Sequence, residues 1–178
     1  MIVTQQVYDG SILDRRFGYR FAKDQISPYG EVIIFVAPIQ TNTQIKSAIN
    51  ICYQLPTGDL WGGIAFQRLY HASLGDIIAN IEQAPVEIFE DAIIINKEFT
   101  QNGIQHLRGR VNLATIRLIS GGVVGHVGIV LETGDKAPAP LYAMQFDNNG
   151  INTFVKEAED RFHQLVKSIY IATEKNTW

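Results

Sequence analysis

The segment Leu113–Glu132, LATIRLISGGVVGHVGIVLE, constrains the fold more than any other part of the chain. It consists of two runs rich in β-branched residues that are joined by a Gly-Gly dipeptide at 121–122, the pattern of a β-hairpin with a two-residue loop. The second run places His126 between two glycines, at 125 and 128. Glycine weakens a strand and often marks the close approach of a backbone or a ligand. The segment therefore predicts a hairpin and is the first candidate for a functional site.

A two-residue loop fixes which side chains of the hairpin share a face. We expect Arg117 to pair with His126, and Thr115 to pair with Gly128. The face that bears these residues is polar, whereas the opposite face is apolar and should pack on helices. The apolar face carries Ala114, Ile116, Leu118, Val127, Ile129 and Leu131.

Apolar runs elsewhere in the chain have the length of β-strands. The clearest is Glu31–Ala37, EVIIFVA, a nearly continuous apolar run that is typical of a strand buried on both faces. We also expect strands at Ile2–Val7, within Val86–Asn96 and at Leu141–Phe146.

Three segments have the signals of helices. Phe66–Ile81 carries one apolar stripe over four turns and ends before Pro85. Thr153–Ala172 carries a second stripe, and Thr43 is a candidate cap for a shorter helix over Ile45–Cys52. Together with the strands, these helices predict an α+β fold in which a mixed, mainly antiparallel sheet is covered by helices.

Length and composition are those of one globular domain spanning residues 1–178. The net charge of −3 does not favour nucleic acid, which usually binds clearly basic domains. No apolar run is long enough to span a bilayer, and the N-terminus lacks the basic flank and the apolar stretch of a signal peptide. We therefore expect a cytoplasmic protein without a membrane segment.

The chain contains a single cysteine, Cys52, which excludes a disulfide or a multi-thiolate zinc site within the chain. On the apolar face of the predicted helix, this thiol is expected to be a core residue rather than a nucleophile. The four histidines show no metal-ligand spacing. We predict no metal site, and the sequence indicates no particular cofactor.

The polar face of the predicted hairpin has the groups that a small anionic or carbonyl ligand requires. Arg117 offers a forked cationic donor, and His126 titrates near neutral pH. Thr115 lies on the same face, and Gly128 would let a ligand approach the backbone. The alternative is a solvated face on which Arg117 and His126 simply pair across the strands.

Two further clusters of charge lie outside the hairpin. The tripeptide Arg-Gly-Arg at 108–110 brings two cations around a flexible residue and is a candidate anion clamp. Glu87, Glu90 and Asp91 place three carboxylates within five positions. Because no histidine lies near them in sequence, these carboxylates are more typical of a solvated strand end than of a metal site.

Four short motifs resemble those of a known family. They are YDGS at 8–11, DAIIINK at 91–97, RGRVNLATIRLIS at 108–120 and HVGIVLE at 126–132. In this order they are similar to a small uncharacterised family, the domain of unknown function number 366, whose fold is like that of biotin and lipoate protein ligases. The lysine that these ligases place after the glycine-arginine pair would fall at Val111. The resemblance thus implies the fold without the usual cation for adenylate chemistry.

Our leading hypothesis is that the protein binds a small carboxylate-bearing or nucleotide-like ligand on the sheet face around His126. Arg110 and Arg117 would hold the anion, and Gly128 would provide clearance. His126 would be the catalytic group, which donates a hydrogen bond or shuttles a proton.

Three more residues complete the predicted ligand site. Thr115 shares the polar face, and Asp9 and Ser11 lie in the turn after the first predicted strand. We expect all three to contribute ligand contacts.

Two other functions compete with this hypothesis. The protein could be a non-catalytic interaction module, in which the polar face and Val124 or Val130 form a homodimer contact about a two-fold axis. A nucleic-acid binder would instead use the basic cluster at Arg15–Lys23, although the net charge makes this the least favoured function.

Overall fold

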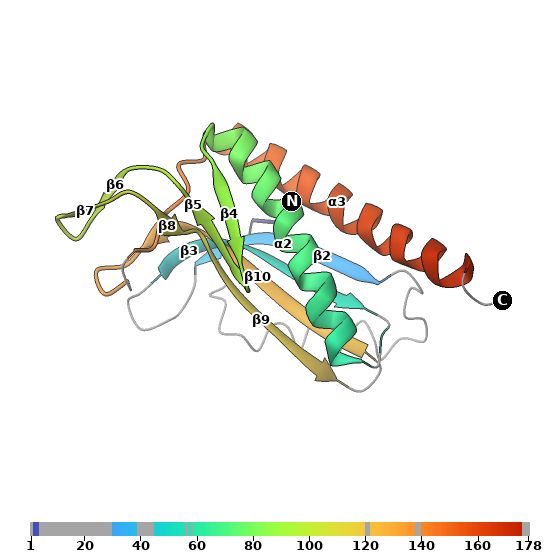
Figure 1. Ribbon diagram of the computed structural model, residues 1–178. Coiled ribbons are helices and arrows are strands. Elements are labelled where there is room, and N and C mark those ends of the chain that lie inside the picture. Colours follow the sequence, from blue (N-terminus) through green and yellow to red (C-terminus); the bar gives the residue numbers. More distant parts are fainter. Residues whose placement is uncertain are drawn as a thin grey trace.

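The computed structural model describes residues 2–3, 30–38, 45–55, 57, 59–119, 122–137 and 140–175. Two long helices, α2 (Leu60–Glu82) and α3 (Asn148–Lys175), lie side by side over one face of a twisted β-sheet (Figure 1). The strands are β1 (Ile2–Val3), β2 (Glu31–Pro38), β3 (Ile45–Leu55), β4 (Val86–Phe89), β5 (Ala92–Ile95), β6 (Phe99–Gln101), β7 (Ile104–His106), β8 (Gly109–Arg110), β9 (Asn112–Ile119) and β10 (Gly122–Thr133). The fold class is α+β, as predicted.

The central sheet has the strand order β1-β2-β3-β10-β9. β1 runs parallel to β2, and the other neighbouring strands of this sheet are antiparallel. A smaller sheet, β4-β5-β8, and the hairpin β6-β7 follow α2 in the chain, and the hairpin projects at the left of Figure 1. A mixed, mainly antiparallel sheet covered by helices is thus confirmed.

The main core lies between the central sheet and the two helices. Tyr53 of β3, Phe66 and Tyr70 of α2, and Phe162 of α3 form an aromatic cluster with ring centroids 5.5–5.9 Å apart. Isoleucine and valine side chains of β3 and β10 surround this cluster. Alternate residues of each strand reach the core because successive side chains point to opposite faces of a sheet.

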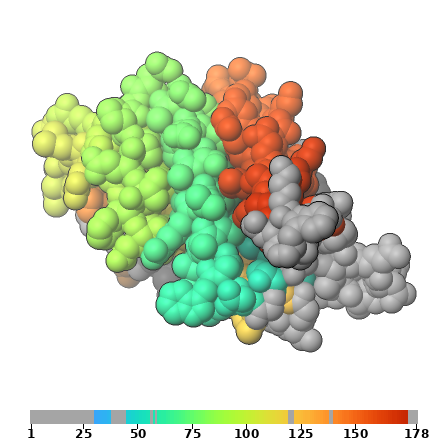
Figure 2. Space-filling view, turned by 45° about the vertical axis from the view of Figure 1, so that its right-hand side comes forward, coloured from blue at the N-terminus to red at the C-terminus, as the bar shows by residue number. Residues whose placement is uncertain are grey.

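α2 forms where the sequence predicted a helix over Phe66–Ile81. Asp59 caps its start, since its carboxylate accepts hydrogen bonds from the backbone N–H groups of Trp61 at 3.0 Å and Gly62 at 2.9 Å. The helix ends at Glu82, and Gln83, the C-cap residue after it, has a left-handed φ of 52°. In the space-filling view of Figure 2, α2 lies between α3 and the strands that follow α2.

α3 contains the predicted helix Thr153–Ala172 and extends it in both directions. Its buried stripe, which includes Phe154, Ala158 and Phe162, packs into the main core. No helix within the described ranges is long and apolar enough to cross a membrane.

The helix predicted over Ile45–Cys52 is wrong, because this segment belongs to β3. β3 is paired with β2 on one side and with β10 on the other. The apolar residues at 45, 48, 49 and 52 fall at helical spacing by coincidence, since every residue from 48 to 55 is buried.

Two hairpins follow α2 where the sequence analysis predicted only one strand. Val86–Asn96 forms β4 and β5, which pair around a turn at Glu90 and Asp91, where Glu90 has a φ of 54°. β6 and β7 pair around Asn102-Gly103, a dipeptide that is typical of two-residue hairpin turns and could have predicted this hairpin.

The remaining predicted strands are matched to different extents. Glu31–Ala37 corresponds to β2, while the predicted strand Ile2–Val7 is described only at Ile2–Val3. Leu141–Phe146 is not a strand, because within the described ranges it contributes only an isolated bridge between Leu141 and Arg110.

The central hairpin forms, but its register differs by two residues from the predicted one. Ile119 pairs with Gly122, so His126 lies opposite Thr115 rather than opposite Arg117. Because side chains alternate with a period of two, a shift of two residues leaves each side chain on its predicted face. The core-facing side of β10 packs in the main apolar cluster, as predicted.

The ring of Tyr53 leaves no room for a side chain at position 125. A Cβ atom at position 125 would lie 2.1 Å from Cζ of Tyr53 and 2.3 Å from its hydroxyl oxygen. We expect Gly125→Ala to lower the free energy of unfolding by about 2 to 3 kcal/mol, because a buried ring would have to move within a packed core. Gly128→Ala is the comparison, since its Cβ would lie 3.3 Å from the His126 ring. Equal losses in urea denaturation of the two variants would contradict this steric assignment.

Glu82, the last residue of α2, is a buried carboxylate with three hydrogen-bond donors. Lys97 Nζ donates to it at 2.5 Å, the Tyr142 hydroxyl at 3.0 Å and the backbone N–H of Gln145 at 3.1 Å. The hydrogen bond to Glu82 also raises the pKa of Lys97 above its ordinary value. One side chain therefore fastens the end of α2 to the segment after β5 and to the segment before α3.

Glu82→Ala should lower the free energy of unfolding by about 3 kcal/mol, because one cation and two dipolar donors lose their acceptor. Glu132→Ala is the control. Glu132 pairs with Lys46 at 3.5 Å, but the two side chains are 59% and 55% exposed, so we expect a loss below about 1 kcal/mol. Chemical denaturation of both variants tests the assignment, which fails if Glu82→Ala is as mild as the control.

Candidate functional site

The face of the central sheet that turns away from the helices carries a group of polar side chains. We call it the polar sheet face and define it by three positions on β3, three on β10 and two on β9: Asn50, Cys52, Gln54, Val124, His126, Gly128, Thr115 and Arg117. These positions share a face because they are cross-strand partners or lie two residues apart on one strand. Cys52, His126 and Thr115 form one row across three strands.

His126 is held at the centre of this face by Asn50. Nε2 of the imidazole lies 3.0 Å from Oδ1 of Asn50, and Nδ2 of Asn50 donates to the carbonyl of Ala48 at 3.2 Å. The second bond fixes the orientation of the amide, so its oxygen faces the imidazole and must be the acceptor. The neutral ring therefore carries its proton on Nε2, which leaves Nδ1 as its acceptor atom.

Burial keeps the imidazole of His126 neutral. Only 7% of the residue is exposed, and desolvation lowers the pKa of His126 from 6.5 to about 4. At neutral pH the side chain thus supplies no positive charge for an anion.

The two glycines that flank His126 have packing roles, contrary to the expectation that they mark room for a ligand. Gly125 gives space to the ring of Tyr53 on the core side. A Cβ at Gly128 would lie 3.3 Å from Cε1 of His126 and 3.8 Å from Oδ1 of Asn50. The imidazole itself fills the space beside Gly128, so this glycine positions the histidine rather than a ligand.

Exposure rises across the polar sheet face from β3 to β9. Asn50 and Cys52 of β3 are 0% and 2% exposed, and His126 of β10 is 7% exposed, whereas Thr115 and Arg117 of β9 are exposed. A molecule from solvent therefore meets Arg117 and Thr115 first, with the imidazole behind them.

Arg110 does not belong to this group. It lies on β8, where its Nε donates to the carbonyl of Asn112 at 2.6 Å and a guanidinium nitrogen lies 3.2 Å from Oδ2 of Asp91. These bonds hold the side chain at the small sheet, so the structure does not bring Arg110 together with Arg117 and His126. Asp9 and Ser11 lie outside the described residues.

Sequence reasoning missed the contribution of β3. Asn50, Cys52 and Gln54 alternate with the buried apolar residues at 49, 51, 53 and 55, which is the period of a strand. Read with that period, the sequence would have placed three polar groups on one face. Gln54 Oε1 is buried and has no hydrogen-bond partner among the described residues.

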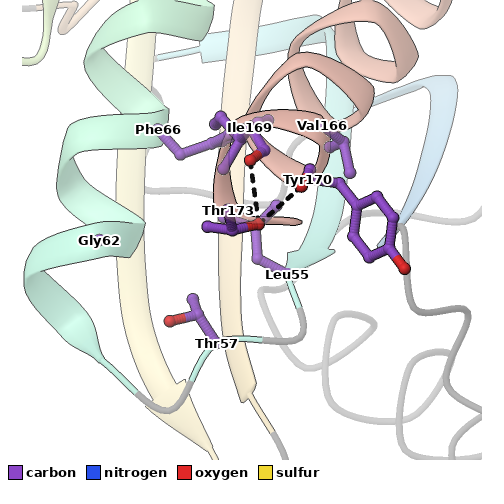
Figure 3. A pocket seen from close by; sticks show the side chains of 8 residues that line it. All are labelled: Leu55, Thr57, Gly62, Phe66, Val166, Ile169, Tyr170 and Thr173. Carbon is purple, nitrogen blue, oxygen red and sulfur yellow. Dashed lines mark hydrogen bonds between the residues drawn. The ribbon is translucent and has the colours of Figure 1, made fainter. Parts of the chain in front are cut away.

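A cavity of about 500 Å³ lies on the helix side, between the start of α2 and the end of α3. Its walls include Leu55, Phe66 and Ile169, and Figure 3 shows the Tyr170 ring pointing away from them. Thr173 Oγ1 lies within hydrogen-bond distance of the carbonyls of residues 169 and 170, at 3.1 and 2.7 Å. The cavity is thus mainly apolar, and the hydroxyl at its edge is already engaged with the helix backbone.

Within the described ranges, no group of three His, Cys, Asp or Glu side chains is arranged to hold a metal ion.

Solved structures with the same fold include a protein of unknown function from Pyrococcus horikoshi. It is 14% identical, has a TM-score of 0.65, and the match covers 99% of this chain and 94% of that one. The chain matches no protein-family model and no curated protein sequence.

Biotin and lipoate enzymes share this fold as well. The biotin protein ligase from Aquifex aeolicus, solved in complex with biotin and ATP, is 10% identical with a TM-score of 0.57, covering 93% of this chain and 69% of that one. P. falciparum LipL1 in complex with lipoate is 10% identical with a TM-score of 0.50, covering 91% of this chain and 61% of that one. At these identities the likeness shows the fold, which is that of biotin and lipoate protein ligases.

The low pKa of His126 predicts a loss of stability in mild acid. The unfolded chain binds this proton near pH 6.5 and the folded protein near pH 4, so stability is full above about pH 6.5 and falls as the pH drops toward 4. The contribution of this residue amounts to about 3 kcal/mol. Urea denaturation between these pH values should give a shallower pH dependence for His126→Gln than for the unchanged protein. Identical slopes would show that the buried imidazole is not neutral.

Proposed function

We propose that the protein binds a small carboxylate-bearing ligand on the β9 side of the polar sheet face, between Arg117 and His126. The observation that carries the proposal is a neutral imidazole, fixed by Asn50, beside an exposed guanidinium on the same face. A cation for the carboxylate and a proton acceptor for a second group of the ligand therefore lie within one small area.

Arg117 supplies the charge in this proposal. A guanidinium can form two parallel hydrogen bonds with a carboxylate, which gives both strength and orientation. Thr115 lies two residues away on the same strand face and adds a hydroxyl. His126 accepts a hydrogen bond, or a proton, from a donor group of the ligand through Nδ1.

The likeness to biotin and lipoate enzymes supports a small carboxylate-bearing ligand. Biotin and lipoate, which are bound in two of the similar structures, are both small carboxylic acids. We also propose that the chain belongs to the uncharacterised family that its four motifs resemble, the domain of unknown function number 366.

Adenylate-forming ligation is not part of the proposal. Val111, the position where the resemblance would place a ligase lysine, is 0% exposed. Its backbone N–H donates to the carbonyl of Ile93, and its carbonyl accepts from Val130, so the residue is built into the strands. We therefore propose ligand binding, with His126 as the group that would take part in any proton transfer.

Two residues that were expected to form the alternative homodimer contact are buried within the chain. Val124 and Val130 are 3% and 0% exposed within the chain and offer no surface to a second copy. The basic cluster at Arg15–Lys23 lies outside the described residues.

Thermal-shift measurements with biotin, lipoate, ATP and octanoate test the proposal. We expect stabilisation by a carboxylate with a hydrogen-bond donor, biotin more than octanoate, and none by the amide of biotin, which lacks the carboxylate. At a hundredfold excess over Kd the melting temperature should rise by about 5 to 10 °C.

Arg117→Ala should abolish the shift, whereas Arg161→Ala, an exposed arginine of α3, should leave it unchanged. No shift with any of the carboxylates, or a shift that survives Arg117→Ala, contradicts the proposal.

A further inference from the structure

α2 presents an apolar face to solvent. Four of its outward residues, which we call the α2 stripe, are Trp61, Ala65, Leu69 and Ala72. Each is separated from the next by three or four positions, so their side chains form one continuous row along the helix. All four are exposed, Trp61 by 82% and Leu69 by 52%. Figure 2 shows α2 along the middle of this face of the molecule.

α3 lies in the same layer but has a different outer side. Its exposed residues include charges of both signs: Lys156, Glu157, Glu159, Asp160, Arg161 and Lys167. This is the usual outer face of a surface helix, which is polar toward water and apolar toward the core. In α2, by contrast, Phe66, Tyr70 and Leu74 fill the core side, and the α2 stripe makes the outer side apolar as well. A helix that is apolar on both sides is normally covered on both.

The order of side-chain sizes along the α2 stripe is self-complementary. Large and small residues alternate from Trp61 through Ala65 and Leu69 to Ala72. Two copies of α2 can lie antiparallel about a two-fold axis near residues 66 and 67. Trp61 of each copy then meets Ala72 of the other, and Leu69 of each meets Ala65. Each bulky side chain fills the space above an alanine, as the close packing of two helices requires.

One charge of each sign flanks the α2 stripe. Arg68 lies on α2, and Glu90 lies in the turn between β4 and β5. Both side chains are exposed and line the same hollow together with Ile88. Neither forms a salt bridge with another described residue. A surface with a cation beside an anion can pair with a copy of itself, because Arg68 of each copy can meet Glu90 of the other across a two-fold axis.

We propose that the protein forms a homodimer in which two copies of α2 pack antiparallel through the α2 stripe. Trp61 and Leu69 form the apolar centre of the contact, and Arg68 and Glu90 form its charged edge. Tryptophan and arginine are residue types that often dominate the binding energy of protein interfaces. The complementary order of sizes and charges favours a second copy over an unrelated protein. Because the polar sheet face turns away from the helices, this dimer leaves it open.

Sedimentation equilibrium of the full chain tests the dimer. At about 100 µM we expect twice the mass of one chain, with dissociation on dilution. Leu69→Glu places a charge at the apolar centre and should weaken the dimer at least about tenfold. Arg161→Glu, on the exposed side of α3, is the control and should leave the dimer unchanged. Both substituted residues are exposed, so the fold of the chain does not depend on them.

An exchange of charges tests the edge of the contact. Arg68→Glu sets like charges opposite each other and should weaken the dimer about tenfold. The double variant Arg68→Glu/Glu90→Arg should regain most of the lost affinity, because opposite charges again meet across the axis. Arg117→Ala, which tests the sheet-face site, should leave the dimer unchanged, so the two proposals can fail separately.

Three results would overturn the dimer. The first is an unchanged protein that is still a monomer at about 100 µM, which would leave the α2 stripe to a different partner. The second is a Leu69→Glu variant that dimerises as tightly as the unchanged protein. The third is a double variant that dimerises no more tightly than Arg68→Glu alone.

Discussion

The pairing of β3 with β10 is the constraint on which the rest of the structure depends. The two strands run antiparallel over most of their length, with β2 and β9 on their outer sides. Their register decides which side chains enter the core and which lie on the opposite face. It places Tyr53 among the rings of α2 and α3, and it places Asn50 within reach of His126. A shift of one residue in this ladder would exchange the two faces and remove both the core and the candidate site.

Close packing in this ladder also explains the composition of β10. Gly125 and Gly128 are the positions where a neighbouring ring lies against the strand backbone, a tyrosine on one face and a histidine on the other. The same strand therefore serves the core and the polar sheet face. The orientation of the imidazole follows from sterics at Gly128 and from one hydrogen bond to Asn50, before any ligand is considered.

The sequence allowed the helices, the central hairpin and its two faces to be predicted, because each has a clear periodicity. β3 was missed although Asn50, Cys52 and Gln54 alternate with apolar residues, because the apolar residues at 45, 48, 49 and 52 also fall at helical spacing. The error at Ile45–Cys52 removed Asn50 and Cys52 from the predicted site. Arg110 was included wrongly, because the chain spacing from 110 to 117 does not reveal that Arg110 bonds to Asp91 in another sheet. Long-range partners of this kind are set by tertiary structure.

The bonds made by Glu82 have a mechanical consequence for α2. They anchor the C-terminal end of the helix, whereas the apolar cavity borders its N-terminal half at Phe66. Phe66 and Tyr70 themselves pack in the aromatic cluster, so α2 is held along its length. A ligand of the apolar cavity would therefore meet a wall at Phe66 whose position the core already sets.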